Sequence, residues 1–194
     1  MEIVIALSLS VIISSALAYL MYQIALGQKE AIATVRLRQA ADLLQDRLLT
    51  GGEGGTRFNL RNASAGSGAL FPTADEISLP GGAKVYRSIL FSESDSSAVR
   101  RRLRFNATTS NVEFYEDWTD SGDYSIVFAS GPSIMLREMY FFESQKTGGI
   151  PDDSTINVYF EMDDNGTNGR TDPADGSKLI QTVTKTFTVT LRDK

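Results

Sequence analysis

The residues best suited to chemistry in this sequence lie between positions 163 and 176, where acidic and amide side chains alternate with glycines. Oxygen ligands in such a loop are what a calcium ion requires, and the candidate ligands are Asp163, Asn165, Asn168, Asp172 and Asp175. The loop is not an EF-hand, because Asn168 stands at the position of the required glycine and Ala174 at that of the bidentate glutamate. The alternative to a calcium cofactor is a solvated turn built from Asn-Gly and Asp-Gly dipeptides.

A second candidate is a basic cluster, formed by Arg100, Arg101, Arg102 and Arg104. Such a cluster is able to contact DNA or anionic lipid. On an alternating strand, however, the first, third and fourth of these arginines share one face. We expect them to meet an acidic surface of a neighbouring subunit or of this domain, such as Glu113 or Glu116. No nucleic-acid partner is predicted, because the net charge of −5 belongs to the part of the chain after residue 50.

A third candidate is an aromatic set, formed by Phe114, Tyr115, Trp118, Tyr124 and Phe128. These side chains either line a ligand groove or fill the core, and their spacing along strands favours the core. Cysteine and histidine are absent from the whole sequence. Their absence excludes Cys or His nucleophiles, His general bases and Cys/His zinc sites. We therefore predict no enzymatic activity; a membrane-anchored hydrolase that uses carboxylates alone is the remaining enzymatic alternative, and no motif places its residues.

The first structural element that the sequence predicts is a long helix that begins at the N-terminus. The segment Ile3–Gln28 holds no charged side chain and, as a helix, is roughly 39 Å long at about 1.5 Å per residue. A hydrocarbon core of about 30 Å requires roughly 20 apolar residues, so residues 1–28 are predicted to span a membrane. Within them, four small residues recur at every fourth position: Ala6, Ser10, Ser14 and Ala18. Stripes of this kind allow helices to approach closely in lipid or in a filament core.

Residues 29–50 continue the helix without a breaker, but in amphipathic form. The expected apolar stripe consists of Ile32, Val35, Ala40, Leu44 and Leu48, with Leu37 and Ala41 beside it. The glycine-rich segment 51–55 is predicted to end the helix and act as a joint. The result is one helix of about 48 residues, roughly 70 Å long, whose second half needs a partner for its apolar side.

Residues 56–194 read as a β-rich globular head. Irregular pieces with turns near Pro72 and Pro80 come first. Strands are then predicted over 84–91, 99–105, 112–115, 124–129, 134–142, 155–162 and 179–191. The last alternates strictly between apolar and polar residues, and we expect its apolar face to cover the amphipathic half of the helix. The fold class is therefore α+β: a long N-terminal helix packed on an antiparallel sheet.

The N-terminal string Met1-Glu2-Ile3-Val4-Ile5-Ala6-Leu7 resembles the mature start of type IV pilins and type II secretion pseudopilins. In that family a prepilin peptidase cuts after a glycine, and a Phe-Thr-Leu-x-Glu string follows. Met1 and Glu2 match the last two positions of that string, and the first three have no counterpart here. The chain also departs from the family in lacking a helix-breaking proline before Pro72 and any cysteine for the common disulfide. The strand-rich head is similar to those of minor members, the J-type pseudopilins and W-type pilins.

The resemblance implies a lollipop-shaped subunit that is stored in the bacterial inner membrane, with its head in the periplasm or outside. Prepilin peptidase and the assembly machinery then act on it, and it joins other pilin or pseudopilin subunits in a filament. It also implies that Glu2 sets the subunit register by pairing with a neighbour's N-terminal ammonium, since a lone carboxylate in hydrocarbon is costly. From the residues alone, the alternative is that Glu2 lies at the level of the lipid headgroups, or stabilises the N-terminus of the helix by interacting with the helix dipole. The alternative function is a signal-anchored monomeric binding module, such as an adhesin.

Overall fold

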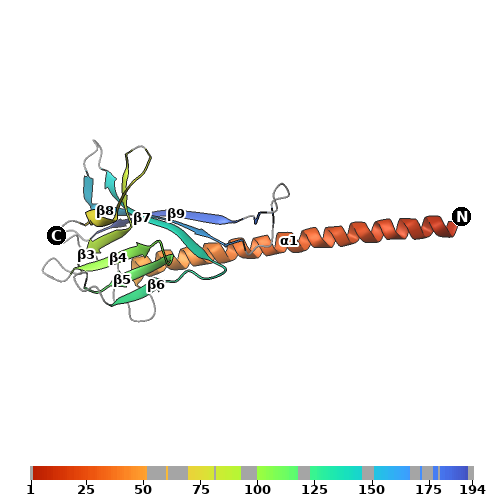
Figure 1. Cartoon of the computed structure of the whole chain (residues 1–194), viewed down its shortest axis with the longest axis horizontal. Coiled ribbons are helices and arrows are strands. Elements are labelled where there is room, and N and C mark those ends of the chain that lie inside the picture. Colours follow the sequence, from red (N-terminus) through yellow and green to blue (C-terminus); the bar gives the residue numbers. More distant parts are fainter. Residues whose placement is uncertain are drawn as a thin grey trace.

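The chain folds into one long helix and a head made of strands (Figure 1). The computed structural model describes residues 2–51, 60, 70–80, 82–92, 100–117, 123–145, 151–166, 171, 177–178 and 180–191. The N-terminal half of the helix projects away from the head, while its C-terminal half lies along the head. The predicted α+β class, with an N-terminal apolar helix and an antiparallel β region, is confirmed.

Helix α1 runs without interruption over Glu2–Thr50. It ends where the sequence predicts, because Gly51 has a φ of +79° and its N–H donates to the carbonyl oxygen of Arg47 at 3.0 Å. A residue with a side chain rarely adopts this left-handed conformation, so glycine terminates the helix. The rest of the predicted joint lies outside the described residues.

The described strands form two antiparallel sheets. The five-stranded sheet has the order β1-β2-β7-β8-β9, and these strands are Glu76–Ser78, Lys84–Tyr86, Met135–Gln145, Pro151–Asp163 and Thr182–Thr190. The four-stranded sheet has the order β3-β4-β5-β6, and these strands are Ser88–Phe91, Arg101–Asn106, Asn111–Tyr115 and Tyr124–Phe128. Edge strands β9 and β6 both contact α1.

The prediction of one continuous strand over 84–91 is wrong. This segment is divided at Arg87 into β2 and β3, which belong to different sheets. Arg87 bonds at both sides: its N–H donates to the carbonyl of Asp75 at 3.1 Å, and its carbonyl accepts from the N–H of Phe105 at 2.8 Å. All four residues of β3 are buried, which is the pattern of a strand covered on both faces rather than an alternating one. The short strand β1 was also not predicted.

The helical stripe that enters the core differs from the predicted one. Leu37, Ala41, Leu44 and Leu48 are completely buried in one cluster with residues from both sheets. Ile32 and Val35, which were expected on this stripe, are 51% and 53% exposed. The reason is geometric: the sheets contact positions 33, 37, 41, 44 and 48, which lie on one side of a 3.6-residue helix, and positions 32 and 35 lie on another.

Polar contacts fix α1 against the two edge strands. On the β9 side, Lys185 forms an ion pair with Asp42 and donates to Gln45 Oε1 at 2.8 Å. Nearby, Thr34 Oγ1 donates to Gln181 Oε1 at 2.8 Å. On the β6 side, Arg47 Nη1 donates to the carbonyl of Val127 at 3.0 Å. The predicted packing of the last strand over the amphipathic half of the helix is confirmed.

The two adjacent leucines at 43 and 44 provide a matched test of this packing. Leu44→Ala removes a completely buried side chain, so we expect the free energy of unfolding to fall by about 2–5 kcal/mol. Leu43→Ala changes a side chain that is 48% exposed and should cost less than about 1 kcal/mol. Urea denaturation of the full chain in detergent, followed by near-UV circular dichroism, measures both. Equal losses in the two variants would contradict the helix orientation described above.

Candidate functional site

The most distinctive surface of the protein is the apolar half of α1. Its large side chains are between 52% and 77% exposed: Ile3, Val4, Ile5, Leu7, Leu9, Val11, Ile12, Ile13, Leu17, Tyr19, Leu20, Met21, Tyr22 and Ile24. By length and composition, this helix is able to cross a membrane. Side chains of this kind are stable only in lipid or against other apolar surfaces.

The small-residue stripe lies within this exposed half. Ala6, Ser10, Ser14 and Ala18 are all exposed, at four-residue spacing on one side of the helix. Two other serines of the segment, Ser8 and Ser15, donate to helix carbonyls at 2.8 Å and so satisfy their hydroxyls locally. The side chain of Glu2 lies outside what the structure describes, and its register role stays a prediction.

Exposed apolar residues continue beyond the membrane-length segment. Ile32, Val35 and Leu43 are about half exposed, on the part of α1 that packs against the head through other positions. The helix therefore presents two apolar surfaces in this region: one fills the core of the head, and the other is left for solvent or a partner. The sequence pattern merged the two surfaces into one stripe.

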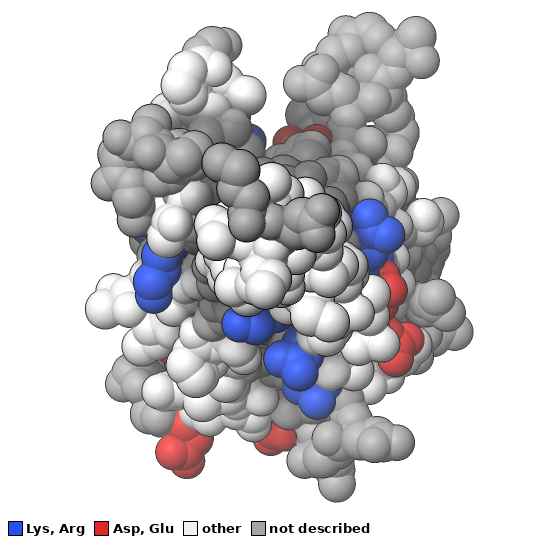
Figure 2. All heavy atoms as spheres, turned by 90° about the vertical axis from the view of Figure 1, so that its right-hand side faces the viewer, with Lys and Arg blue, Asp and Glu red and all other residues white. Residues whose placement is uncertain are grey.

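The face of the head around the helix carries several basic side chains. Figure 2 looks along α1 from its N-terminal side and shows Lys and Arg side chains on several sides of the centre, with acidic side chains beside the basic group on the right and at the lower edge. Lys29 and Arg36 of α1 line a cavity of about 260 Å³ together with Ser133 and Asp164. When the apolar half of α1 lies in a bilayer, this face is next to the headgroups, where basic side chains favour anionic lipids.

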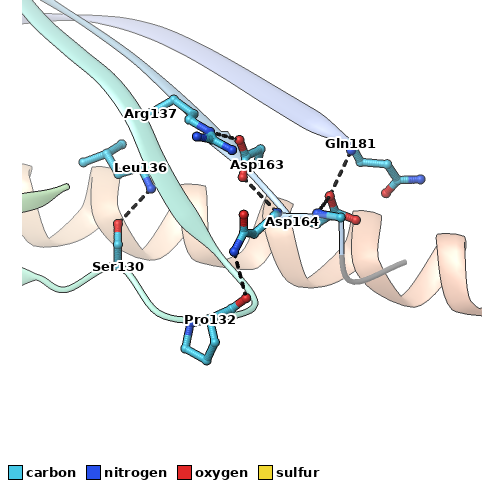
Figure 3. Close-up of polar contacts among 9 residues, drawn as sticks. Ser130, Pro132, Leu136, Arg137, Asp163, Asp164 and Gln181 are labelled. Atoms are coloured by element: carbon cyan, nitrogen blue, oxygen red, sulfur yellow. Dashed lines mark hydrogen bonds and ion pairs between the residues drawn. The ribbon is translucent and has the colours of Figure 1, made fainter. Parts of the chain in front are cut away.

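The acidic turn after β8 was the predicted calcium site (Figure 3). Asp163 and Asp164 are both buried. Asp163 forms an ion pair with Arg137 and accepts the N–H of Asn165 at 2.8 Å. Oδ1 of Asp164 accepts the N–H groups of Gly166 at 3.1 Å and of Gln181 at 3.0 Å. These bonds shape the turn and hold it next to the start of β9.

The calcium site stays a prediction, because only residues 163–166 and 171 of the loop belong to the described part of the chain. Asn168, Asp172 and Asp175 lie outside the described residues. Within the described part of the chain, no three acidic, His or Cys residues are grouped as metal ligands. Asp164, which was not among the predicted ligands, is the more unusual residue: its Oδ2 is buried without a described hydrogen-bond partner, and the residue lines the cavity beside α1. The feature of the sequence that could have identified Asp164 is the Asp-Asn-Gly string at 164–166, which is typical of a tight turn.

Two members of the arginine cluster, Arg102 and Arg104, have acidic partners within the head. Arg102 on β4 forms an ion pair with Asp75, whose carboxylate also accepts from Ser88. Arg104 lies directly opposite Glu113 on β5, as predicted. Its neighbour Glu113 is buried and accepts from Asn106 Nδ2 at 2.7 Å and from Tyr115 Oη at 2.8 Å. Asp75 was the partner that the sequence did not indicate, because it lies 27 residues before Arg102.

The aromatic set divides between core and surface. Phe114 and Phe128 are buried in the core, as expected. Tyr115 is half-buried, and Tyr124 is 51% exposed, so the prediction of a core position is wrong for Tyr124. Its strand, β6, is the edge of its sheet, where one side of the strand is open. Trp118 lies outside the described residues.

Comparison with known proteins gives no relative: no protein-family model, no curated protein and no solved structure matches this chain.

The carboxyl group of Asp75 makes stability depend on pH. Burial acts to raise its pKa, but the hydrogen bonds from Ser88 and Arg102 and the charges of Arg102 and Arg104 outweigh burial and hold the pKa below its ordinary value of 3.8. The ionised group therefore stabilises the fold above pH 3.8, and this contribution is lost as the pH falls through the lower pKa of the folded state.

We therefore expect Asp75→Asn to lower the unfolding midpoint at neutral pH, and its difference from the unmodified protein to shrink as the pH falls below 3.8. Thermal unfolding at a series of pH values measures this difference. Asp123→Asn, at an exposed position, is the matched control and should show no such trend. A difference for Asp75→Asn that grows in acid would contradict the assigned ion pair.

Proposed function

We propose that this protein is a structural subunit of a helical filament of the type IV pilus or type II secretion pseudopilus class. The observation that carries the proposal is the division of α1: its C-terminal half is held in the head, and its N-terminal half is apolar and exposed. A helix with this distribution needs two environments in turn, lipid before assembly and neighbouring helices after it. The resemblance of the first seven residues to pilins supports the same conclusion.

Before assembly, the subunit is a single-pass protein of the bacterial inner membrane with its head in the periplasm. Prepilin peptidase and the assembly machinery are its expected partners, followed by copies of itself or related subunits. The strand-rich head, built from two sheets, favours a minor subunit. Glu2 has the role of matching subunit register, since its charge in an apolar bundle requires a cationic partner.

Because the sequence contains no cysteine, single cysteines introduced on the helix test which positions contact a neighbouring helix. In cells that assemble the filament, we expect Ser10→Cys and Ser14→Cys to form disulfide-linked dimers on mild oxidation. A disulfide requires Cα atoms about 4.4–6.8 Å apart, which only the close approach of small-residue faces provides. Non-reducing electrophoresis measures the dimer.

Ile12→Cys is the matched control, because Ile12 lies on another side of the same exposed helix and should give little dimer. Glu2→Ala should weaken the cross-link of Ser10→Cys by disturbing the register. A protein that stays monomeric with cysteines on the stripe, while the assembly machinery is present, would contradict the filament proposal.

The second apolar surface of α1 gives an independent prediction. We expect the double variant Ile32→Ser and Val35→Ser to reduce filament yield several-fold, because it removes apolar contacts between neighbouring helices. The stability of the isolated subunit should change by less than about 1 kcal/mol, since both side chains are half exposed in it. Shearing of surface filaments and immunoblotting measure yield, and thermal unfolding measures stability. Filament yield equal to that of the unmodified protein would show that this surface faces solvent.

A further inference from the structure

The head carries a groove that the filament proposal does not use. It has a volume of about 870 Å³ and lies on the five-stranded sheet, with Leu79 and residues 82–86 along it. Its floor includes Tyr140 and Phe142 of β7 and Asn157 and Tyr159 of β8. A groove of this volume falls within the range of about 300–1,000 Å³ that is typical of ligand sites.

The strand pattern explains why these side chains share one face. The neighbours Met139, Phe141, Val158 and Phe160 are completely buried in the core, so the alternate positions on β7 and β8 point to the opposite face. Tyr140 pairs directly with Tyr159, and Phe142 pairs with Asn157. The sheet therefore places two tyrosines, a phenylalanine and an amide next to one another.

The two tyrosine rings have a common orientation. Their centroids are 6.1 Å apart and their planes differ by 12°, so their faces point in the same direction. Burial, together with the nearby Glu138 and Glu161, raises the pKa of Tyr140 and of Tyr159, so both phenols are neutral hydrogen-bonding groups at pH 7. The Tyr159 hydroxyl donates to Glu161 Oε2 at 3.2 Å.

The polar groups around the rings are mainly acceptors. Glu138 and Glu143 line the groove together with Asn157. Of the described residues that line it, Lys84 is the one cation, and its ammonium is 3.0 Å from Glu76. Arg87, which does not line the groove, also acts on the Tyr140 hydroxyl, where its charge and hydrogen bond lower the pKa against the effects of burial and Glu138. A phosphate or another anionic ligand would meet two carboxylates, which repel it. A purely apolar ligand would bury those carboxylates without hydrogen bonds, which is costly.

We propose that this groove binds a neutral oligosaccharide. A pyranose ring has an apolar face of C–H groups, which packs on the face of Tyr140 or Tyr159, and a rim of hydroxyl groups, which donate to the carboxylates and the amide. The ligand needs no charge of its own, because the aromatic rings pack on its C–H groups and the acceptors bind its hydroxyl groups. This site is on the head and does not depend on whether the subunit enters a filament.

The test uses the full chain in dodecylphosphocholine, a detergent without a sugar headgroup. The probes are the neutral sugars cellohexaose, maltohexaose and hexa-N-acetylchitohexaose, and binding is measured by isothermal titration calorimetry. We expect at least one of them to bind with a Kd below about 1 mM. Tyr140→Ala and Tyr159→Ala should each weaken that binding about tenfold, which corresponds to about 1.4 kcal/mol.

Tyr124→Ala is the matched control, because Tyr124 is an exposed tyrosine of the other sheet and does not line the groove. It should leave the affinity unchanged. Added NaCl should also have no effect, because the ligand is neutral.

Three results would overturn the proposal. The first is the absence of binding by all three sugars to a protein whose circular dichroism shows it folded. The second is equal weakening by Tyr124→Ala. The third is salt-sensitive binding of hexalysine that Tyr140→Ala abolishes, which would assign the groove to a cationic peptide.

Discussion

The structure depends on one contact, the packing of the C-terminal half of α1 between the edge strands of two sheets. Leu37, Ala41, Leu44 and Leu48 fill the space where the inner faces of both sheets meet, and all four are completely buried. Without this helix, the apolar side chains of both sheets that pack against it would be exposed. The head and the C-terminal half of the helix therefore share one core, and the apolar half extends from it as part of the same uninterrupted helix.

Polar side chains make this packing specific. Apolar contacts alone allow a helix to slide or rotate by a small step at little cost, whereas hydrogen bonds hold only at one register. Lys185 with Asp42 and Gln45, and Thr34 with Gln181, fix α1 along β9. The orientation fixed in this way leaves Ile32, Val35 and Leu43 facing outward. The head thus decides which side of this part of the helix stays exposed.

The two sheets are joined where β2 passes into β3 at Arg87. This change of sheet places Asp75 beside Arg102 and so ties the segment before β1 to the centre of the four-stranded sheet. It also leaves one face of β7 and β8 uncovered by the core, and that face carries the aromatic groove. The internal ion pair of Arg102 with Asp75 and the external groove on β7 and β8 therefore lie on either side of this change of sheet.

The sequence alone determined the helix, its glycine stop, most strands and the class of the fold, because these depend on local periodicity and on residues such as Gly51 that act on their own backbone. Tertiary structure decided the rest. Several apolar side chains on 29–50 were compatible with a buried stripe, and only the positions of β6 and β9 selected Leu37 and Leu44 over Ile32 and Val35. The partner of Arg102 and the pairing of Tyr140 with Tyr159 join residues distant in sequence, so no local pattern reveals them.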